Sequence, residues 1–334
     1  MIYLKKAVTL IDIANACGTS NVTVSKALAG KSGVSESLRE KIKQVAEEMG
    51  YVGVKGTAYK GKNNIGVIIP AKFINPNGSF YWALYNSLVT RFKKENMFCI
   101  MEILEQEDEG GLILPHLITD KQISGLISLG QLAEDYAKLL YHNVKNLILL
   151  DYYVPSLDID AVVTNGYSGG YKLASYLIKM GHKRIGYIGK KFATTSIFDR
   201  YMGYMKALIE NGLEIREDWV VDDRDNRDFI HMTFPEDMPT AFVCNCDEAA
   251  FLAIKQLRSM GCRVPEDISI VGYDNYLISE ISEPTITTVN VDAEYMADLA
   301  VKTLVKRMEN PDEKPRIRTI EGDLVIKDSV VELK

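Results

Sequence analysis

Residues 19–30, TSNVTVSKALAG, divide into an apolar side and a mostly polar side when placed on a helix. Val24, Ala27 and Leu28 recur at intervals of three and four residues, so they would share one face and pack inward. Ser20 directly precedes this pattern and is a residue type that caps helix N-termini. The opposite side of the predicted helix consists of Asn21, Val22, Ser25, Lys26 and Ala29. The stretch therefore predicts a short helix with one buried and one exposed face.

Helices are also predicted on both sides of this stretch. Upstream, Thr9 and Asp12 have the spacing of a capping box, apolar residues follow on one face, and Gly18 ends the helix. Downstream, a third helix begins near Ser35, and its apolar face consists of Leu38, Ile42, Val45, Ala46 and Met49. Two short helices joined by a tight turn, with a third packed behind them, predict an all-α helix-turn-helix head over residues 1–50.

The exposed side of the second helix suits contact with DNA. Its short side chains and single Lys allow close approach to base edges, and Thr9, Ser20 and Thr23 can reach phosphates through hydroxyls and helix-terminal amides. Residues 1–62 hold nine Lys and one Arg against one Asp and four Glu, a net charge of +5, whereas the whole chain carries -6. A basic head on an acidic body favours DNA binding. A three-helix module that binds proteins is the alternative.

The head resembles the DNA-binding domain of the LacI/GalR family of bacterial transcription regulators, and the likeness is most specific in CGTSNVTVSKAL, VSESLREKI and MGY. It implies that Asn21 and Val22 contact bases in the major groove, and that Lys26 occupies a further base-reading position that is usually Arg. Lys keeps the charge but lacks the bidentate fork of Arg. Ala29 stands where the family often has Asn, so one polar contact is missing.

Residues 51–64, YVGVKGTAYKGKNN, are rich in Gly, Asn and Lys and predict a flexible, basic linker. The resemblance implies a hinge helix here, with a Leu that inserts into the minor groove. This segment departs from the pattern because it is about three residues short and has no Leu. Tyr59 is the alternative residue for insertion into the minor groove. We expect weak hinge ordering and modest DNA bending.

The body, residues 65–334, alternates short apolar runs with longer segments of helical periodicity. The apolar runs are IGVIIP, FCIMEIL, GLISL, NLILLD, RIGYIG, TAFVCN and ISIVGYD. A repeated βα unit predicts parallel sheets covered by helices, here as an α/β body of two lobes. A late helix from about 293 to 308, followed by LVIKDSVV, indicates that the chain crosses between lobes more than once. We place the N-lobe at about 65–160 and 291–319, and the C-lobe at about 161–290 and 320–334.

Ligands of α/β proteins collect beyond the carboxyl ends of the strands. Polar and aromatic residues expected at these ends, or at the start of the next helix, are Phe80, Tyr81, Asp151, Arg200 and Asp274. Charged groups bind hydroxyls bidentately and rings cover apolar faces, so this set suits a small polyhydroxylated ligand. The alternatives are a turn residue for Asp274 and a surface ion pair for Arg200.

The body also resembles the effector domain of the same family, a type I periplasmic-binding-protein fold, in NNIGVIIP, ISGLISLG, MGHKRIGYIG and VPEDISIVGYDN. The resemblance implies that Arg200 and Asp274 bind an effector and that aromatic residues near Phe80 and Tyr81 line the same cleft. Two departures concern the ligand rather than the fold. Cys246 occupies the place of a frequent Asn, and Asn165 stands where Asp is common.

We find no pattern that predicts catalysis, a cofactor or a metal site. His182 has no partner nucleophile, the pair Cys244 and Cys246 has no nearby His or Cys cluster, and neither a P-loop nor a G-x-G-x-x-G follows a strand. Five Cys without framework spacing, no export signal and no long apolar segment favour a cytoplasmic protein.

We therefore predict a homodimeric transcription regulator, a repressor, that binds a near-palindromic operator and a small-molecule effector, a sugar or sugar derivative. The rival functions are a transport-type sugar-binding protein without a DNA role and a sugar-modifying enzyme.

Overall fold

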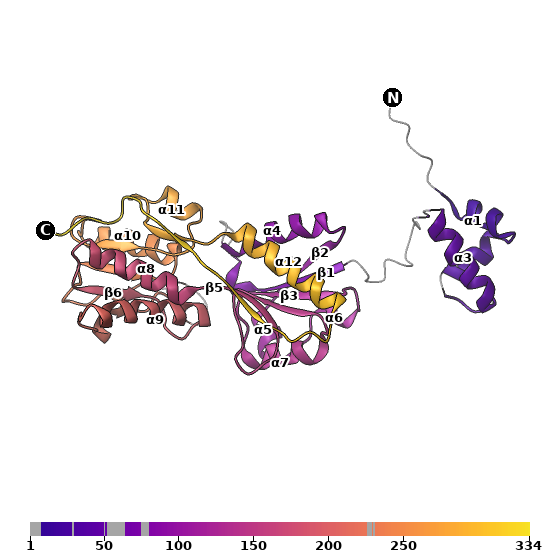
Figure 1. The fold of residues 1–334 in the computed structure, drawn as a ribbon, viewed down its shortest axis with the longest axis horizontal. Coiled ribbons are helices and arrows are strands. Elements are labelled where there is room, and N and C mark those ends of the chain that lie inside the picture. The colour runs from indigo at the N-terminus through magenta and orange to yellow at the C-terminus, as the bar shows by residue number, and fades with distance from the viewer. Residues whose placement is uncertain are drawn as a thin grey trace, which may run out of the picture. The chain divides into compact units, whose positions relative to one another are not determined.

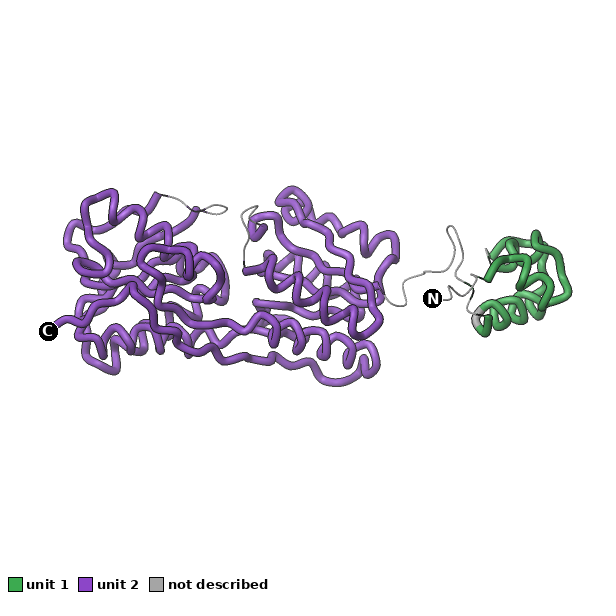
Figure 2. Tube along the Cα trace, turned by 90° about the horizontal axis from the view of Figure 1, so that it is seen from above, with its two compact units in different colours: residues 1–63 green, residues 64–334 purple. Residues whose placement is uncertain are grey.

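The computed structural model describes residues 8–28, 30–49, 51, 64–74, 80–225, 229 and 231–334. The chain divides into two compact units, Met1–Asn63 and Asn64–Lys334 (Figures 1 and 2). Tyr59 and most of the predicted linker lie outside the described residues. Within the described residues, no helix is both long and apolar enough to cross a membrane.

The first unit contains three helices, as the periodicity predicts. They are α1 (Leu10–Cys17), α2 (Asn21–Leu28) and α3 (Glu36–Glu48). The capping box of Thr9 and Asp12 is present, and Gly18 ends α1 with a φ of 66°, a left-handed conformation that suits glycine. The helices pack around a core of Ile13, Ala14, Cys17, Val24, Ala27, Ile42 and Ala46. The predicted all-α head is confirmed.

The second unit contains two parallel sheets, one in each lobe. The first-lobe sheet has six strands in the order β11-β5-β4-β3-β1-β2, and every pairing in it is parallel. Its strands are β1 (Asn64–Pro70), β2 (Phe98–Leu104), β3 (Gly125–Leu129), β4 (Leu147–Leu150), β5 (Asp160–Thr164) and β11 (Ile317–Ile320). The predicted two-lobed α/β body is confirmed.

Helices cover both faces of the six-stranded sheet (Figure 1). One face is covered by α4 (Phe80–Lys94) and α12 (Ala293–Glu309), and the other by α7 (Glu134–Asn143). The lobe also contains three short elements, η1 (Ala71–Phe73), α5 (Gln106–Gly110) and α6 (His116–Thr119). Successive side chains of a strand point to opposite faces. Ile65, Val67 and Ile69 of β1 therefore pack with α4 and α12, whereas Ile68 packs with α7.

The second lobe repeats this construction around the sheet β7-β6-β8-β9, which is also parallel. Its strands are β6 (Ile185–Ile188), β7 (Val220–Val221), β8 (Ala241–Cys244) and β9 (Ser269–Val271). Its helices are α8 (Gly166–Lys179), α9 (Thr195–Glu210), α10 (Asp247–Ser259), α11 (Leu277–Ile281) and the 3-10 turn η2 (Glu217–Trp219). Tyr187 of β6 packs toward α8 and α9, and its neighbour Ile188 packs toward α10.

The chain crosses between the lobes from β5 to α8, from β10 (Thr288–Asn290) to α12, and from β11 to β12 (Asp323–Val325). The prediction of more than one crossing is confirmed. β10 and β12 pair as a two-stranded antiparallel sheet at this junction. β5 pairs with β4 and β11, so the first-lobe sheet extends to Thr164 rather than ending at the expected boundary of 160.

Candidate functional site

The outer face of α2 carries the residues expected to contact DNA. Asn21, Val22, Ser25 and Lys26 are exposed, and the large apolar Val22 is 63% exposed. The Ser20 hydroxyl accepts a hydrogen bond from the Thr23 amide at 3.1 Å and lies 2.8 Å from the Thr23 hydroxyl. The hydroxyl of Thr9 is engaged with the carboxylate of Asp12 at 2.7 Å. The structure thus places all seven described candidates at the surface of the head, while Tyr59 lies outside the described residues.

The body contains a cavity of about 350 Å³ at the interface of its lobes. All six residues predicted to bind an effector line it: Phe80, Tyr81, Asp151, Arg200, Cys246 and Asp274. The first three come from the first lobe, and the others come from the second. We call this space the effector cavity. Sequence reasoning about strand ends therefore predicted residues that the fold brings together.

The two aspartates that line the effector cavity share an unusual backbone. Asp151 follows β4 with a φ of 68°, and Asp274 follows β9 with a φ of 107°. Residues other than glycine rarely adopt positive φ, and such strain concentrates at functional sites. Asp274 is fixed there because its amide donates to the Val289 carbonyl at 2.9 Å, and its own carbonyl accepts from the Val291 amide at 3.2 Å. The second-lobe carboxylate is thus bonded to the segment that crosses to the first lobe.

Glycines on the helices place Arg200 at the cavity. A Cβ on Gly170 of α8 would lie 2.0 Å from the Arg200 carbonyl oxygen, and a Cβ on Gly203 of α9 would lie 2.0 Å from the Tyr167 carbonyl oxygen. Only glycine permits this approach of the two backbones. The run GYSGG on α8 therefore sets the position of α9 and, with it, the depth of the Arg200 side chain.

The guanidinium of Arg200 is held from several sides although the residue is only 6% exposed. Its Nη1 donates to the Asn245 carbonyl at 2.6 Å, its Nη2 lies 3.6 Å from Asp274 Oδ1, and its plane lies 3.8 Å from the centre of the Tyr273 ring. Its buried Nε has no hydrogen-bond partner in the part of the chain that the structure describes. A buried donor without a partner is costly in free energy.

Burial shifts the acid-base properties of the cavity carboxyls. It raises the pKa of Asp274 to about 7 and raises that of Asp151, and in both cases the positive charge of Arg200 opposes the shift. Tyr81 donates its hydroxyl to Asp151 Oδ2 at 2.8 Å, and burial raises the pKa of this phenol well above its ordinary value. Hydroxyls of a ligand could replace lost water contacts at both carboxyls.

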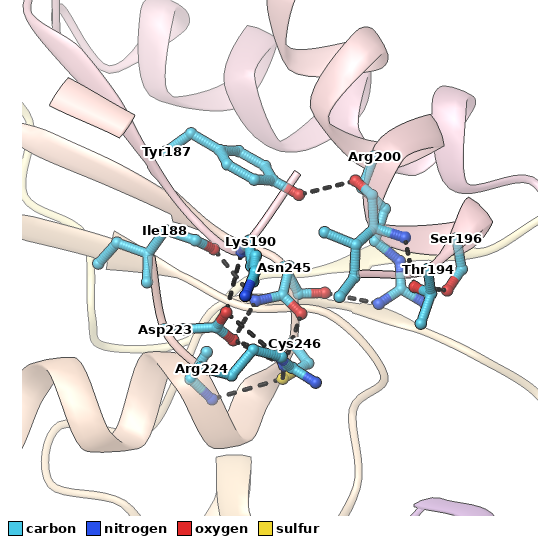
Figure 3. Close-up of polar contacts among 12 residues, drawn as sticks. Tyr187, Ile188, Lys190, Thr194, Ser196, Arg200, Asp223, Arg224, Asn245 and Cys246 are labelled. Atoms are coloured by element: carbon cyan, nitrogen blue, oxygen red, sulfur yellow. Dashed lines mark hydrogen bonds and ion pairs between the residues drawn. The ribbon is translucent and has the colours of Figure 1, made fainter. Parts of the chain in front are cut away.

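Arg224 also lines the effector cavity but was not predicted (Figure 3). Its guanidinium makes a bidentate contact with fully buried Asp223, with distances of 2.6 and 3.0 Å, and Nη2 donates to Asn245 Oδ1 at 3.2 Å. The same nitrogen lies 3.9 Å from Cys246 Sγ. Arg224 follows a strand of only two residues within the charged run DDRD, which has no apolar pattern to indicate a strand end. The other lining residues that were missed include Phe73, Thr194, Ser196, Glu248 and Tyr276.

The structure also places four other residues that the sequence analysis singled out. Cys244 ends β8, but Cys246 lies beyond the strand and caps α10, where its Sγ accepts from the Ala249 amide at 3.4 Å. Asn165 caps α8 and does not line the effector cavity. Buried His182 contacts Thr240 Oγ1 at 3.0 Å and the Val331 carbonyl at 3.1 Å, which is a structural role. The described residues contain no cluster of three His, Cys, Asp or Glu side chains that could hold a metal ion.

A helix-turn-helix head and a two-lobed periplasmic-type body define the class of DNA-binding regulators that carry a ligand-binding domain. Residues 9–53 match the family described as bacterial regulatory proteins, lacI family, and residues 174–330 match the periplasmic binding protein-like domain. The chain therefore combines a DNA-binding domain of the lacI family with a periplasmic binding protein-like domain.

Whole-length relatives are similar to this chain. The ribose operon repressor of Haemophilus influenzae is 26% identical over 98% of this chain and 99% of its own length. The HTH-type transcriptional repressor PurR of Pasteurella multocida is 28% identical over 96% of this chain and 98% of its own length. The solved lac repressor dimer bound to operator and the anti-inducer ONPF has the same fold, with a TM-score of 0.70, 21% identity, and coverage of 98% of this chain and 100% of that one.

Proposed function

We propose that the protein is a repressor that binds a near-palindromic operator as a homodimer and is controlled by a sugar or sugar derivative in the effector cavity. Its relatives from Haemophilus and Pasteurella are named as repressors, which supports that direction of control. A protein that acts on operator DNA works in the cytoplasm. Binding in the cavity would change the relation of the lobes, and its coupling to operator binding is reciprocal.

The observation that carries the sugar assignment is the composition of the cavity wall. The wall contains three basic residues, Lys72, Arg200 and Arg224, and three acidic ones, Asp151, Glu248 and Asp274. Aromatic rings of Phe73, Phe80, Tyr81 and Tyr276 complete it. Equal numbers of acidic and basic residues favour a ligand without net charge, and their polar atoms favour a ligand with many hydroxyls. The aromatic rings favour a ligand with flat apolar faces. A neutral sugar meets all three conditions.

A homodimer is supported by an apolar surface on the first lobe. Trp82 and Val89 of α4 are exposed, as is Ile103 of β2, and β2 is an edge strand of the six-stranded sheet. We call this surface the α4–β2 face. A second copy of the chain is the occupant we propose, because two heads are needed to read two half-sites of a symmetric operator.

A thermal-shift screen of the full chain against sugars tests the ligand class, since a ligand that binds only the native state raises the melting temperature. The sugar that gives a shift is then added to a gel-shift assay with operator DNA selected from a random pool. We expect the sugar to change operator affinity. A shift caused by a purine base, with none caused by any sugar, would contradict the sugar assignment. A chain that selects no DNA sequence would instead support the transport-type alternative.

A further inference from the structure

A second cavity, of about 430 Å³, borders the effector cavity. The two share Lys72, Phe73, Thr194 and Arg224 as lining residues. We call the second space the outer cavity. Both volumes fall within the range of about 300–1,000 Å³ that is typical of small-molecule sites, so each space alone can hold a ligand group. A ligand that fills the first cavity can therefore extend into the second without a change of fold.

Aromatic rings form the walls of the outer cavity. Phe192, on the loop between β6 and α9, is 78% exposed, and its ring lies 5.3 Å from that of Phe198. Phe73 lies at the junction of the two cavities and is stacked on Tyr81 at 4.6 Å, which fixes its orientation. A large ring left in water costs free energy that a ligand can recover by covering it. The rings thus offer apolar faces to a second ligand unit.

The charged residues that line the outer cavity are Lys72, Lys190, Lys191, Arg224, Asp222 and Asp225. Three of the cations form ion pairs with carboxylates outside this lining. Lys191 Nζ lies 2.7 Å from Glu217, Lys72 Nζ lies 3.9 Å from Glu109, and Arg224 is paired with Asp223. A phosphate bound here would compete with these carboxylates for its cations. Ion pairs instead offer both hydrogen-bond donors and hydrogen-bond acceptors, and the hydroxyls of a neutral ligand can bind to both. The outer cavity therefore favours a sugar unit over an anionic group.

We propose that the effector is an oligosaccharide of at least two units, with one unit in the effector cavity and the next in the outer cavity against Phe192 and Phe73. This inference rests on the proposed function, because it specifies the length of the sugar. The inner unit contacts Arg200 and Asp274, and the outer unit adds affinity through contact with the rings. A single sugar unit fills the inner cavity only and gains none of this contact.

The test compares glucose, galactose and ribose with cellobiose, maltose and lactose, by thermal shift and then calorimetric titration of the full chain. We expect at least one disaccharide to bind at least about tenfold more tightly than its constituent monosaccharides. Phe192→Ala should remove that advantage and leave monosaccharide binding unchanged, whereas Phe192→Tyr should retain it. Because Phe192 is exposed, neither change should lower the melting temperature. Tyr141→Ala, on α7 and outside both cavities, is the matched control and should behave as wild type.

The outcomes separate this inference from the proposed function. Equal affinity for mono- and disaccharides, or a disaccharide preference that survives Phe192→Ala, overturns the outer subsite while the sugar-controlled regulator stands. If neither monosaccharides nor disaccharides bind, both proposals fail. Operator binding by the same preparation shows in each case that the protein is folded and competent.

Discussion

Arg200 organises the effector cavity because one guanidinium contacts three residues from two different loops of the second lobe. It bonds the loop after β8 through Asn245, faces Asp274 beyond β9, and lies on the ring of Tyr273. Its Nε remains unpartnered among the described residues. Arg200 and Asp274 therefore form a buried ion pair, and both residues line the effector cavity.

We predict that Arg200→Ala and Asp274→Ala each weaken effector binding by at least about tenfold, because removal of either leaves a desolvated polar partner unpaired. Operator binding should persist, since the head is unchanged. Calorimetric titration with the screened ligand measures the first effect, and gel shifts measure the second. If both variants keep full ligand affinity and only melt earlier, the two residues are structural.

Stability should depend on pH through Asp274. Its pKa in the folded protein is about 7, because burial outweighs the opposing charge of Arg200 and the charge of Asp151 adds to the shift, whereas an unfolded Asp titrates near about 4. Between these values the folded state binds more protons than the unfolded state, so the free energy of unfolding falls as pH rises. This contribution is complete below about pH 4 and lost above about pH 7.

The comparison of the ligand-free wild type with Asp274→Asn isolates this effect. The melting temperature of the wild type, relative to that of the variant, should decrease from pH 5 to pH 8. A difference that is constant over this range would show that Asp274 stays ionised in the folded protein.

At the scale of single elements, the two faces of α2 differ in role. One face packs in the core of the head, and the other is exposed for the proposed contact with DNA. Val24 and Ala27 are buried in the head, whereas Asn21, Val22, Ser25 and Lys26 are exposed. Substitutions on the exposed face should therefore leave folding intact. The short side chains of this face also keep the helix backbone close to whatever surface it contacts.

We predict that Asn21→Ala and Lys26→Ala each weaken operator binding by about 1 to 3 kcal/mol, because each removes a contact to base edges. The melting temperature should stay nearly constant. Lys43→Ala, which removes the same charge from the exposed side of α3, is the control and should have a smaller effect. Equal operator affinity for wild type, Asn21→Ala and Lys26→Ala would contradict the major-groove assignment.

The elements differ in how far the sequence predicts them. The head helices and the buried strands have strong periodicity, so their type and the strand-end residues Asp151 and Asp274 were predictable. β7 has two residues, and β11 alternates exposed and half-buried positions before Ile320, so only tertiary pairing with neighbouring strands defines them. Arg224 was missed for the same reason. Cys246 lies beyond β8, which ends at Cys244, and directly before α10, which begins at Asp247.

At the scale of the whole molecule, the α4–β2 face determines whether two chains associate. We predict that Trp82→Glu combined with Ile103→Glu shifts the protein from dimer to monomer, because each change places a charge in an apolar contact. Light scattering after size-exclusion chromatography measures the mass. Tyr141→Glu, on the helix that covers the opposite face of the sheet, should remain a dimer. A variant that stays dimeric would place the interface elsewhere.

The crossings between the lobes also bear on how the protein is made. β11, near the end of the chain, completes the first-lobe sheet beside β5, and the second lobe is closed by bonds from Ile270 to Ser329 and from His182 to Val331. During synthesis, N-terminal domains generally fold first as they leave the ribosome. The head can follow this order, but neither lobe of the body can close until residues 317–331 have emerged. From the time β5 emerges until β11 follows, the nascent body therefore keeps an unpaired strand edge, the kind of edge that favours aggregation.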